Sequence, residues 1–559
     1  MKNISFFLTI FLALSALSCK NGYLDEVPLD RFSPENLLVN ESGFDAVLTA
    51  LYESVRSEHH LSGNFDYMNL GTDVVRWGRA DSRGFADYTL INSYAEPSRL
   101  YWNWAYEKVL PRANLILDNI DNMDIDISEE SRNNIKGQAL FFRGYVYNIL
   151  ANLFGGVPIV ETLYSEPRFD FERESRENVL LFAMSDLEAA SRLLAIDIAE
   201  DGRVPRAAAF HLLSEVYITL AMLSGDDSYY DKSIGAADKV IGKEAGDYEI
   251  ATQRFGPASS SPGDVFSDVF AYGQINRSEG NKEVIWAYQI ELYILGNSGS
   301  QLPRLWAPQY DVIRTPNGIK NNSVDSLPRG IGVNSPTNYA KYYIWDDPND
   351  IRNSKHNIRR TFYYNNPADP EYFQKPIRTA YGSDGNLYVT REDGTLTTQR
   401  LDTLFGYYPW FRKIDGHPSA DQPSSGNTAK DMSRMRVSET YLLRAEAYFR
   451  KGDLDKAAAD INVVRGRAKA SLIGASDVTE DYILDERARE LLVEEPRMRT
   501  LIRMGRLVDR VRKYNSEPAG TGGRSAGSTI QEHNALWPIP QAVIDANSGA
   551  VLEQNPGYN

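Results

Sequence analysis

Residues 69–79 bring together side chains that could hold a ligand through several kinds of contact. The segment reads Asn-Leu-Gly-Thr-Asp-Val-Val-Arg-Trp-Gly-Arg, so it offers one carboxylate, two guanidinium groups and one indole, on Asp73, Arg76, Arg79 and Trp77. Its apolar residues follow neither a helical nor a strand period, which favours a loop, and loops on a rigid scaffold often carry binding residues. A tryptophan that only packs under a turn is an equally good interpretation of these residues alone.

Carboxylates also gather between Asp485 and Glu495, where two of them could act as the acid and base of a glycoside hydrolase. However, arginines lie three or four residues from these glutamates, the spacing at which opposite charges pair along one face of a helix. We therefore interpret the cluster as ion-paired structure. Because HExxH and P-loop signatures are also missing, we predict no catalytic residues and no enzyme activity.

The sequence offers two weak candidates for a metal site. His59 and His60 are adjacent, but no second group of ligands lies close to them in the sequence, so a solvated loop is favoured. The acidic segment from Asp118 to Glu130 lacks the glycine and terminal glutamate that an EF-hand loop requires, and we interpret it as a connection between helices. We therefore predict no metal site and no cofactor.

Charge and the N-terminus limit the partners of the chain. The net charge of −16 and the lack of a long basic run argue against nucleic acid, because phosphate binding needs clustered Lys and Arg. Residues 1–18 carry Lys2 and then an apolar run too short to span a bilayer, which indicates a cleaved signal peptide. Cys19, the only cysteine, follows directly and is typical of a lipid-modified lipoprotein cysteine. An ordinary signal with an incidental cysteine is the alternative.

The clearest sign of a scaffold for these candidates runs from Val437 to Ala468. Apolar residues recur there at three- and four-residue spacing on both sides of the turn dipeptide Gly452-Asp453. Two amphipathic helices joined by a tight turn form an αα-hairpin of about 32 residues, close to the length of a tetratricopeptide unit. Because one unit cannot bury its apolar face alone, further units are expected.

Helical periodicity continues through the N-terminal part of the chain and then fades. We expect helices near residues 41–56, 100–119, 135–153, 180–194, 205–220 and 234–241. Pro, Gly, Asn and Tyr crowd together from 246 to 434, where short extended pieces are expected at 284–292 and 387–390. The predicted fold class is mainly α: a tetratricopeptide-like helical-repeat scaffold of about four αα-hairpins with a large, irregular, loop-rich insertion that carries short strands.

These observations divide the chain into six predicted segments. They are a signal peptide (1–18), a lipid-anchored tether (19–40), an N-terminal helical and TPR-like region (41–245), an irregular ligand-binding insertion (246–434), C-terminal TPR-like hairpins (435–515) and a C-terminal extended segment (516–559).

An ordered set of motifs across nearly the whole chain resembles the SusD/RagB family of nutrient-binding outer-membrane lipoproteins. In order, the motifs are Cys19 with YLDEVP, LFGGVPIV after a long helix, GRVPRAA at a helix start, YLLRAEAYFRKGDLDKAAADINVVRGRA, WPIP and the terminal QNPGY. A helical hairpin alone is a weak signal, whereas the ordered set is specific. The chain departs from the family pattern after Glu495, where Pro496 and Thr500 replace the usual Gly and Asp.

The resemblance implies a tetratricopeptide half that supports an irregular, ligand-binding half. It also implies a non-catalytic lipoprotein, anchored in the outer membrane and facing outward, that delivers an oligosaccharide to a SusC-like TonB-dependent transporter. The expected partners are thus a glycan, this transporter and the outer membrane. A helical-repeat glycoside hydrolase, a TPR scaffold for protein partners and a peptide-uptake protein are the alternatives.

The resemblance also suggests where the ligand binds. Sugars present C–H faces that lie on aromatic rings, and hydroxyl groups that need polar partners. Trp77 lies in a Thr-Asp-x-x-x-Trp segment similar to the family's ligand-facing loop, and Tyr293 and Trp306 flank a Gly/Ser loop in the corresponding stretch of the insertion. Packing is the simpler interpretation of any single aromatic residue there. The expected ligand-binding residues are Asp73, Arg76, Trp77, Arg79, Tyr293 and Trp306.

Overall fold

The computed structural model describes residues 37–60, 66–79, 84–121, 125–164, 166–291, 299–323, 329–416, 426–517 and 525–558. Cys19, the predicted signal peptide, most of the predicted tether and Tyr293 lie outside these residues.

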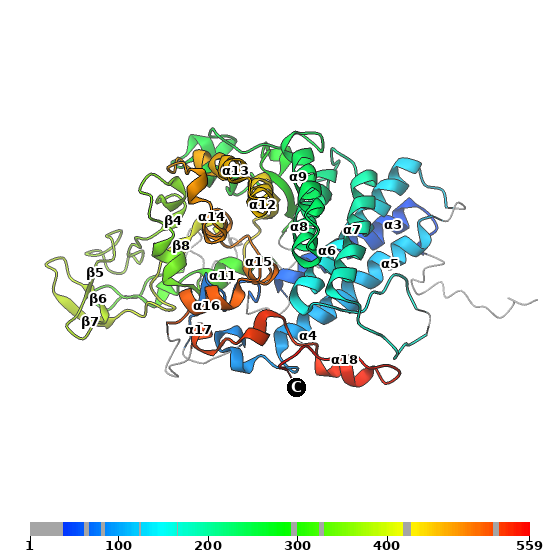
Figure 1. The fold of residues 1–559 in the computed structure, drawn as a ribbon. Helices are drawn as coiled ribbons and strands as arrows, with labels where there is room; N and C mark the ends of the chain where they lie inside the picture. Colours follow the sequence, from blue (N-terminus) through cyan, green and yellow to red (C-terminus); the bar gives the residue numbers. More distant parts are fainter. Residues whose placement is uncertain are drawn as a thin grey trace, which may run out of the picture.

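A stack of helices forms one side of the molecule (Figure 1). Its members are α3 (Glu41–Arg56), α4 (Glu96–Asn103), α5 (Leu110–Asn119), α6 (Glu129–Phe154), α7 (Arg176–Leu193), α8 (Arg206–Ser224), α9 (Ser228–Ile241), α12 (Val437–Arg450) and α13 (Leu454–Arg467). Each of α6, α7 and α8 packs on the next helix, and α9 packs on α12. The C-terminal hairpin thus continues the N-terminal stack across the irregular insertion, which confirms the mainly α, helical-repeat fold.

The hairpin α12–α13 has the predicted turn. Gly452 adopts a φ of 79°, the left-handed conformation that glycine tolerates best. The predicted apolar positions Ala445, Ile461 and Val464 are fully buried. The structure differs in burying Leu442 on another side of α12 as well, because α12 lies between α9 and α13 and also contacts α14 (Glu480–Leu491). A helix inside a repeat stack is covered on two faces, so a single stripe understates its burial.

Two expectations about helices need correction. The helix expected at 100–119 is divided by a π-helical turn, Trp104–Val109, because Pro111 has no backbone N–H to continue the regular hydrogen-bond ladder. The C-terminal segment expected to be extended contains the helix α18 (Gln541–Ala546). Among the described residues, only α8 is long and apolar enough to cross a membrane, and most of its apolar stretch is buried inside the helical stack.

The irregular half contains small antiparallel sheets. Its strands are β1 (Val75–Trp77) paired with β3 (Asn334–Pro336), β2 (Val284–Tyr288) with β9 (Met432–Arg436), β4 (Ile358–Arg359) with β8 (Trp410–Phe411), and the sheet β5 (Thr379–Tyr381), β6 (Leu387–Thr390) and β7 (Leu396–Arg400). Strand β6 confirms the extended piece expected at 387–390, and β2 confirms the first part of the piece expected at 284–292. The β5–β7 sheet projects at the end of the molecule away from α3 (Figure 1).

Short helices complete the structure. They are α10 (Val265–Val269), α11 (Leu302–Trp306), α14 (Glu480–Leu491), α15 (Arg497–Arg503), α16 (Leu507–Tyr514) and α17 (Ala526–Thr529).

A buried set of ion pairs, which we call the charged seam, joins the insertion to the C-terminal helices. The insertion contributes Glu283, Asp350 and Arg352, the end of strand β9 contributes Arg436, and the C-terminal helices contribute Arg465, Arg467, Glu486 and Glu490. The Glu486 carboxylate lies 2.8 Å from Arg352 and 2.9 Å from both Arg465 and Arg489. The acidic cluster on α14 is therefore ion-paired, as predicted, although most of its partners are distant in sequence.

Candidate functional site

The predicted binding loop, residues 69–79, is fixed from several directions. Strand β1 pairs with β3, so that Trp77 lies opposite Asn334. The Thr337 hydroxyl donates to the Asp73 carbonyl oxygen at 2.6 Å, and the Asn515 amide donates to the carbonyl oxygens of Thr72 and Val75 at 2.7 and 2.9 Å. These contacts hold the loop as a rigid part of the irregular half.

Asp73 is a buried structural anchor. Its carboxylate accepts hydrogen bonds from Arg497 at 2.9 and 2.7 Å and from Arg510 at 3.0 Å. Burial alone would raise the pKa of this carboxyl group, but the two guanidinium groups hold its pKa below the ordinary value. The carboxylate is therefore occupied within the protein, and this position contradicts a direct role in binding a sugar hydroxyl.

The two predicted tryptophan platforms are also in the interior. Trp77 is 3% exposed and Trp306 is 1% exposed. The Trp306 indole N–H donates to the Asp66 carboxylate at 3.0 Å, and its carbonyl oxygen accepts from the Tyr408 hydroxyl at 3.0 Å. Neither ring has a face open to a ligand in this structure, because both form part of the core between the loops. Packing is thus the interpretation that the structure supports for these two residues.

Of the two arginines of the loop, Arg76 is buried and Arg79 is half-buried. Arg76 forms an ion pair with Glu517, and the Asn338 amide donates to the same carboxylate. Arg79 is half-buried, with its guanidinium carbon 5.1 Å from the centre of the Phe405 ring. Among the described residues of the predicted set, only Arg79 is partly exposed, and Arg76 is linked to the surface through its ion pair with the partly exposed Glu517.

An exposed aromatic group adjoins Arg76 and Glu517, and we call it the tyrosine surface: Tyr342, Tyr343, Tyr381 and Arg360. Tyr342 is 52% exposed and Tyr381 is 72% exposed. The Arg360 guanidinium carbon lies 5.7 Å from the centre of the Tyr342 ring. Burial raises the pKa of the Tyr342 hydroxyl, Arg360 lowers it, and Tyr381 and Glu517 raise it, so these groups lie close enough to interact.

The arrangement suits the chemistry of a neutral polar ligand. Exposed tyrosine rings offer apolar faces together with hydroxyl groups, and the guanidinium of Arg360 and the amide of Asn338 offer donors. The buried Lys341 ammonium lies 5.8 Å from the Tyr342 ring centre, and burial first, then Arg76, lowers its pKa to about 8. Within the described parts of the chain, no group of three or more His, Cys, Asp or Glu could hold a metal ion.

Sequence reasoning did not select the tyrosine surface. The segment 339–343 contains three tyrosines in five residues, a density that could have drawn attention to it. Yet Tyr339 is buried against Arg510 whereas Tyr342 and Tyr343 are exposed. The segment forms a π-helical turn, and its exposed side is set by contacts with α16 that no local pattern reveals.

Two family models match the chain on either side of its irregular middle. The model described as "Starch-binding associating with outer membrane" matches residues 22–218, and the model described as "SusD family" matches residues 310–558. The chain belongs to the SusD/RagB family. The match also shows that the departures at Pro496 and Thr500 do not affect its membership.

Similar proteins cover nearly the whole SusD-like chain. The starch-binding protein SusD of Bacteroides thetaiotaomicron is 24% identical over 517 residues, which cover 88% of this chain and 85% of that protein. Among solved structures, a SusD homolog from the same species has a TM-score of 0.70 at 18% identity, with 94% and 99% of the two chains covered. A laminarin-binding SusD-like protein has a TM-score of 0.64 at 20% identity, with 93% and 100% covered. At these identities the structures establish a shared fold.

Proposed function

We propose that this SusD/RagB protein is a non-catalytic, glycan-binding lipoprotein of the outer membrane. It captures an oligosaccharide and delivers it to a SusC-like TonB-dependent transporter. The lipid anchor is assigned to Cys19, on the signal-like sequence that precedes it. The outer-membrane location is supported by the description of the family model that matches residues 22–218.

The observation that carries the proposal is the tyrosine surface. Exposed apolar groups that gather on one surface, rimmed by polar residues, mark interaction sites. Here three tyrosines that are more than half exposed lie beside Arg360, Asn338 and Glu517. Relatives named for binding starch and laminarin support a carbohydrate as the class of ligand. We assign the main glycan contacts to Tyr342, Tyr343 and Tyr381, with Arg79 and Arg76 at the border.

The buried carboxylates support a non-catalytic role. Burial raises the pKa of Asp431 to about 6 and also raises the pKa of Asp66, as in a general acid. However, the cavities that these residues line measure only about 30 and 20 Å³, which is room for a water molecule and not for a sugar ring. They are therefore poor candidates for hydrolytic acid and base groups.

One further match to a catalytic pattern has a structural explanation. Residues 523–527 read Gly-Arg-Ser-Ala-Gly, the letters of a hydrolase nucleophile turn. In this structure Ser525 is buried, and its hydroxyl accepts from the Ser528 backbone N–H at 3.2 Å as the N-cap of α17. A nucleophile turn would place an exposed serine between a strand and a helix, whereas Ser525 serves a helix start.

Calorimetric titration of the purified protein against defined neutral oligosaccharides tests the proposal, with chromatography of each mixture afterwards. We expect saturable heat with at least one glycan and no new products. Shorter sugars in the mixture would overturn the non-catalytic role, and heat with peptides alone would favour peptide uptake. Co-purification of the lipidated protein with a SusC-like transporter from native membranes tests the proposed delivery. If the two proteins do not co-purify, the proposed transporter partnership is contradicted.

A further inference from the structure

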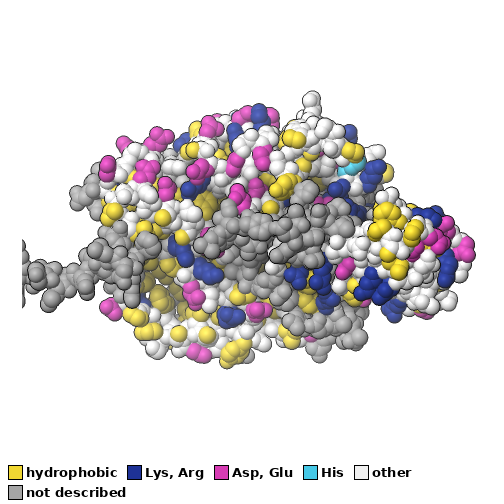
Figure 2. Space-filling model, turned by 180° about the vertical axis from the view of Figure 1, so that it is seen from behind, with side chains coloured by type: hydrophobic (Ala, Val, Ile, Leu, Met, Phe, Trp, Pro, Cys, Tyr) yellow, Lys and Arg dark blue, Asp and Glu magenta, His cyan; other side chains and the backbone are white. Residues whose placement is uncertain are grey.

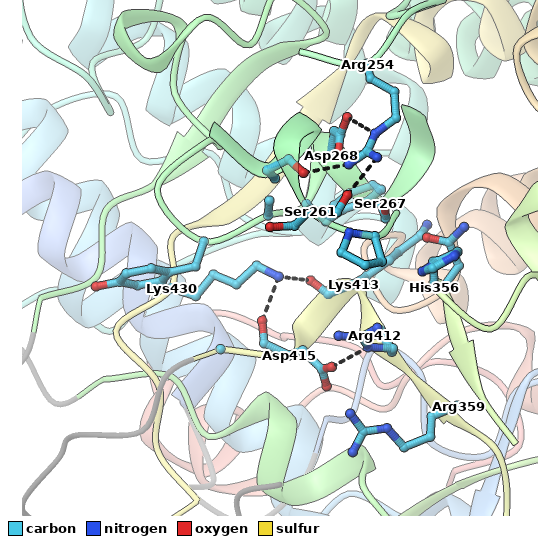
Figure 3. A pocket seen from close by; sticks show the side chains of 17 residues that line it. Arg254, Ser261, Ser267, Asp268, His356, Arg359, Arg412, Lys413, Asp415 and Lys430 are labelled. Carbon is cyan, nitrogen blue, oxygen red and sulfur yellow. Dashed lines mark hydrogen bonds and ion pairs between the residues drawn. The ribbon is translucent and has the colours of Figure 1, made fainter. Parts of the chain in front are cut away.

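A second cavity lies in the irregular half of the protein (Figure 3). Its volume is about 480 Å³, within the range of roughly 300–1,000 Å³ that is typical of small-molecule sites. The walls come from α10 and the loops on both sides of it, from β4 and the turn before it, from residues 412–416 after β8, and from Lys430. We call this cavity the basic pocket.

The pocket is basic although the whole chain carries a net charge of −16. Its charged lining residues are Arg254, Arg359, Arg412, Lys413 and Lys430 against Asp268 and Asp415. On the rear face of the molecule, Lys and Arg side chains gather on the half that carries the β5–β7 sheet (Figure 2). Local enrichment of one charge sign against the overall charge raises the local concentration of oppositely charged ligands.

Several of these cations are neutralised within the protein. Arg254 lies 2.7 Å from the Asp268 carboxylate, Arg412 lies 2.7 Å from the Asp415 carboxylate, and Lys413 lies 2.6 Å from Glu494. Figure 3 shows the first two pairs on opposite walls of the pocket. These pairs build the walls and leave no excess charge of their own.

Arg359 and Lys430, in contrast, are not neutralised by an ion pair of this kind among the described residues. In the part of the chain that the structure describes, neither has a carboxylate oxygen within 4.0 Å. The Arg359 guanidinium carbon lies 5.5 Å from the Trp410 ring centre. The buried Lys430 ammonium donates to the carbonyl oxygens of Lys413 and Asp415 at 2.7 Å each, and these partners carry no net charge. A cation held away from water without a counter-ion is costly, so an anion in the pocket would be stabilised.

A tyrosine ring and an imidazole also line the pocket. The Tyr272 ring lines it and is 53% exposed, which offers an apolar face for the C–H side of a sugar ring. The half-buried imidazole of His356 lines the same space as Arg359 (Figure 3). An aromatic face beside unneutralised cations matches a ligand that is both a sugar and an anion.

We propose that the basic pocket binds an acidic sugar residue, a uronate or a sulfated sugar, through Arg359 and Lys430, with Tyr272 under its ring. The proposal rests on the proposed function in taking the anion to be carried by a saccharide. The pocket is distinct from the tyrosine surface, because none of the residues that line it belongs to that surface. Arg359 at the end of β4 lines the pocket, whereas the next residue, Arg360, lies over Tyr342.

Matched disaccharides separate charge from shape. The full chain is titrated with digalacturonate, with its neutral methyl ester, with a sulfated disaccharide and with inorganic sulfate. We expect digalacturonate or the sulfated disaccharide to bind at least about tenfold more tightly than the methyl ester, since a hydrogen bond to a charged group contributes that much. The tighter of the two charged sugars identifies the acidic group.

Substitutions assign the binding to the pocket. Arg359→Gln should weaken binding of the charged sugar by about tenfold or more and leave the methyl ester within about twofold. Tyr272→Ala should weaken binding of both. Arg391→Gln is the matched control, because it removes the same charge from an exposed turn of the same half. Melting curves check that each variant is folded, and Lys430→Gln, which removes the other proposed anion-binding charge, replaces Arg359→Gln if that variant does not fold.

Three results would overturn the proposal. They are equal binding of charged and neutral disaccharides, equal loss with Arg359→Gln and Arg391→Gln, and binding of inorganic sulfate as tight as that of either charged sugar, which would indicate a site for a simple anion. The proposed function fails separately: if Tyr381→Ala changes no glycan affinity while Arg359→Gln does, the tyrosine surface is wrong and the basic pocket stands.

Discussion

Tyr381 has the most exposed ring of the tyrosine surface. A substitution at this residue should therefore change ligand binding with the least effect on folding. We predict that Tyr381→Ala weakens glycan affinity about 3- to 10-fold, the contribution of one aromatic contact. The melting temperature should stay close to that of the wild type, because the ring makes few contacts to lose. Calorimetry on the glycan that gives saturable heat measures the first effect. Tyr381→Phe, which keeps the ring face, is the control and should retain most of the affinity.

Trp306 should behave in the opposite way. Removing its buried ring leaves a cavity and deprives Asp66 of an N–H donor, so Trp306→Ala should lower the free energy of unfolding by about 3–5 kcal/mol. Urea denaturation measures this loss, and Trp306→Phe separates the ring from its N–H group. A stable Trp306→Ala variant with weakened glycan binding would restore this residue to the binding site.

The contrast between these residues shows what sequence can reveal at a single position. The types of residue suggested aromatic contacts in the irregular half, where the proposed tyrosine surface also lies, and Arg76 of the predicted set pairs with Glu517 at its edge. Which rings are exposed depends on contacts between distant segments, such as Trp306 with Asp66. A sequence window contains no trace of such contacts, so it could not separate Trp77 from Tyr342.

At the scale of elements, the turn between α12 and α13 offers a direct test of the hairpin. Gly452 has a positive φ and open space around it, whereas Gly466 lies within α13 and has open space where an added Cβ would point. We predict that Gly452→Ala lowers the free energy of unfolding by about 1 kcal/mol, because alanine is strained there. Gly466→Ala should be neutral or stabilising by up to about 1 kcal/mol, because alanine favours a helix.

Chemical denaturation of both variants checks this pair. Equal effects of the two substitutions would contradict the turn conformation described here.

The elements themselves were largely predictable. Helix α3 begins and ends at the expected residues, and β6 matches its expected range, because amphipathic periods and strand composition are local properties. The π-helical turn at Trp104–Val109 and the helix α18 were not predictable. Pro111 and Pro540 mark the two places in the sequence, but apolar periodicity alone does not show how the backbone continues past a proline.

For the whole molecule, the charged seam predicts instability in acid. Burial would raise the pKa of Glu486, but Arg352, Arg489 and Arg465 lower its pKa to about 2. A carboxyl group with a depressed folded pKa contributes stability above its ordinary pKa, and this contribution is lost as the pH falls through the folded value. We therefore predict a melting temperature that falls steadily from about pH 4.5 towards pH 2, with Glu486 alone contributing on the order of 3 kcal/mol.

Calorimetric melting across this pH range measures the effect. Glu486→Gln should be less stable at pH 7 and should show a shallower fall in acid, because one titrating group is gone. Asp197→Asn, at an exposed carboxylate, should follow the wild-type curve. A parallel fall for Glu486→Gln and the wild type would show that the seam does not control acid stability.

The charged seam also limits how this fold can be recombined. Glu283 and Arg352 come from the insertion, whereas Arg467 and Glu490 come from the helices, and each is buried with partners from the other side. A chimera that grafts the insertion of a relative onto this scaffold would leave buried charges without their ion-pair partners, unless both sides of the charged seam are transferred together. Ligand preference can therefore diversify freely in the loops, while the boundary between the two halves is inherited as a unit.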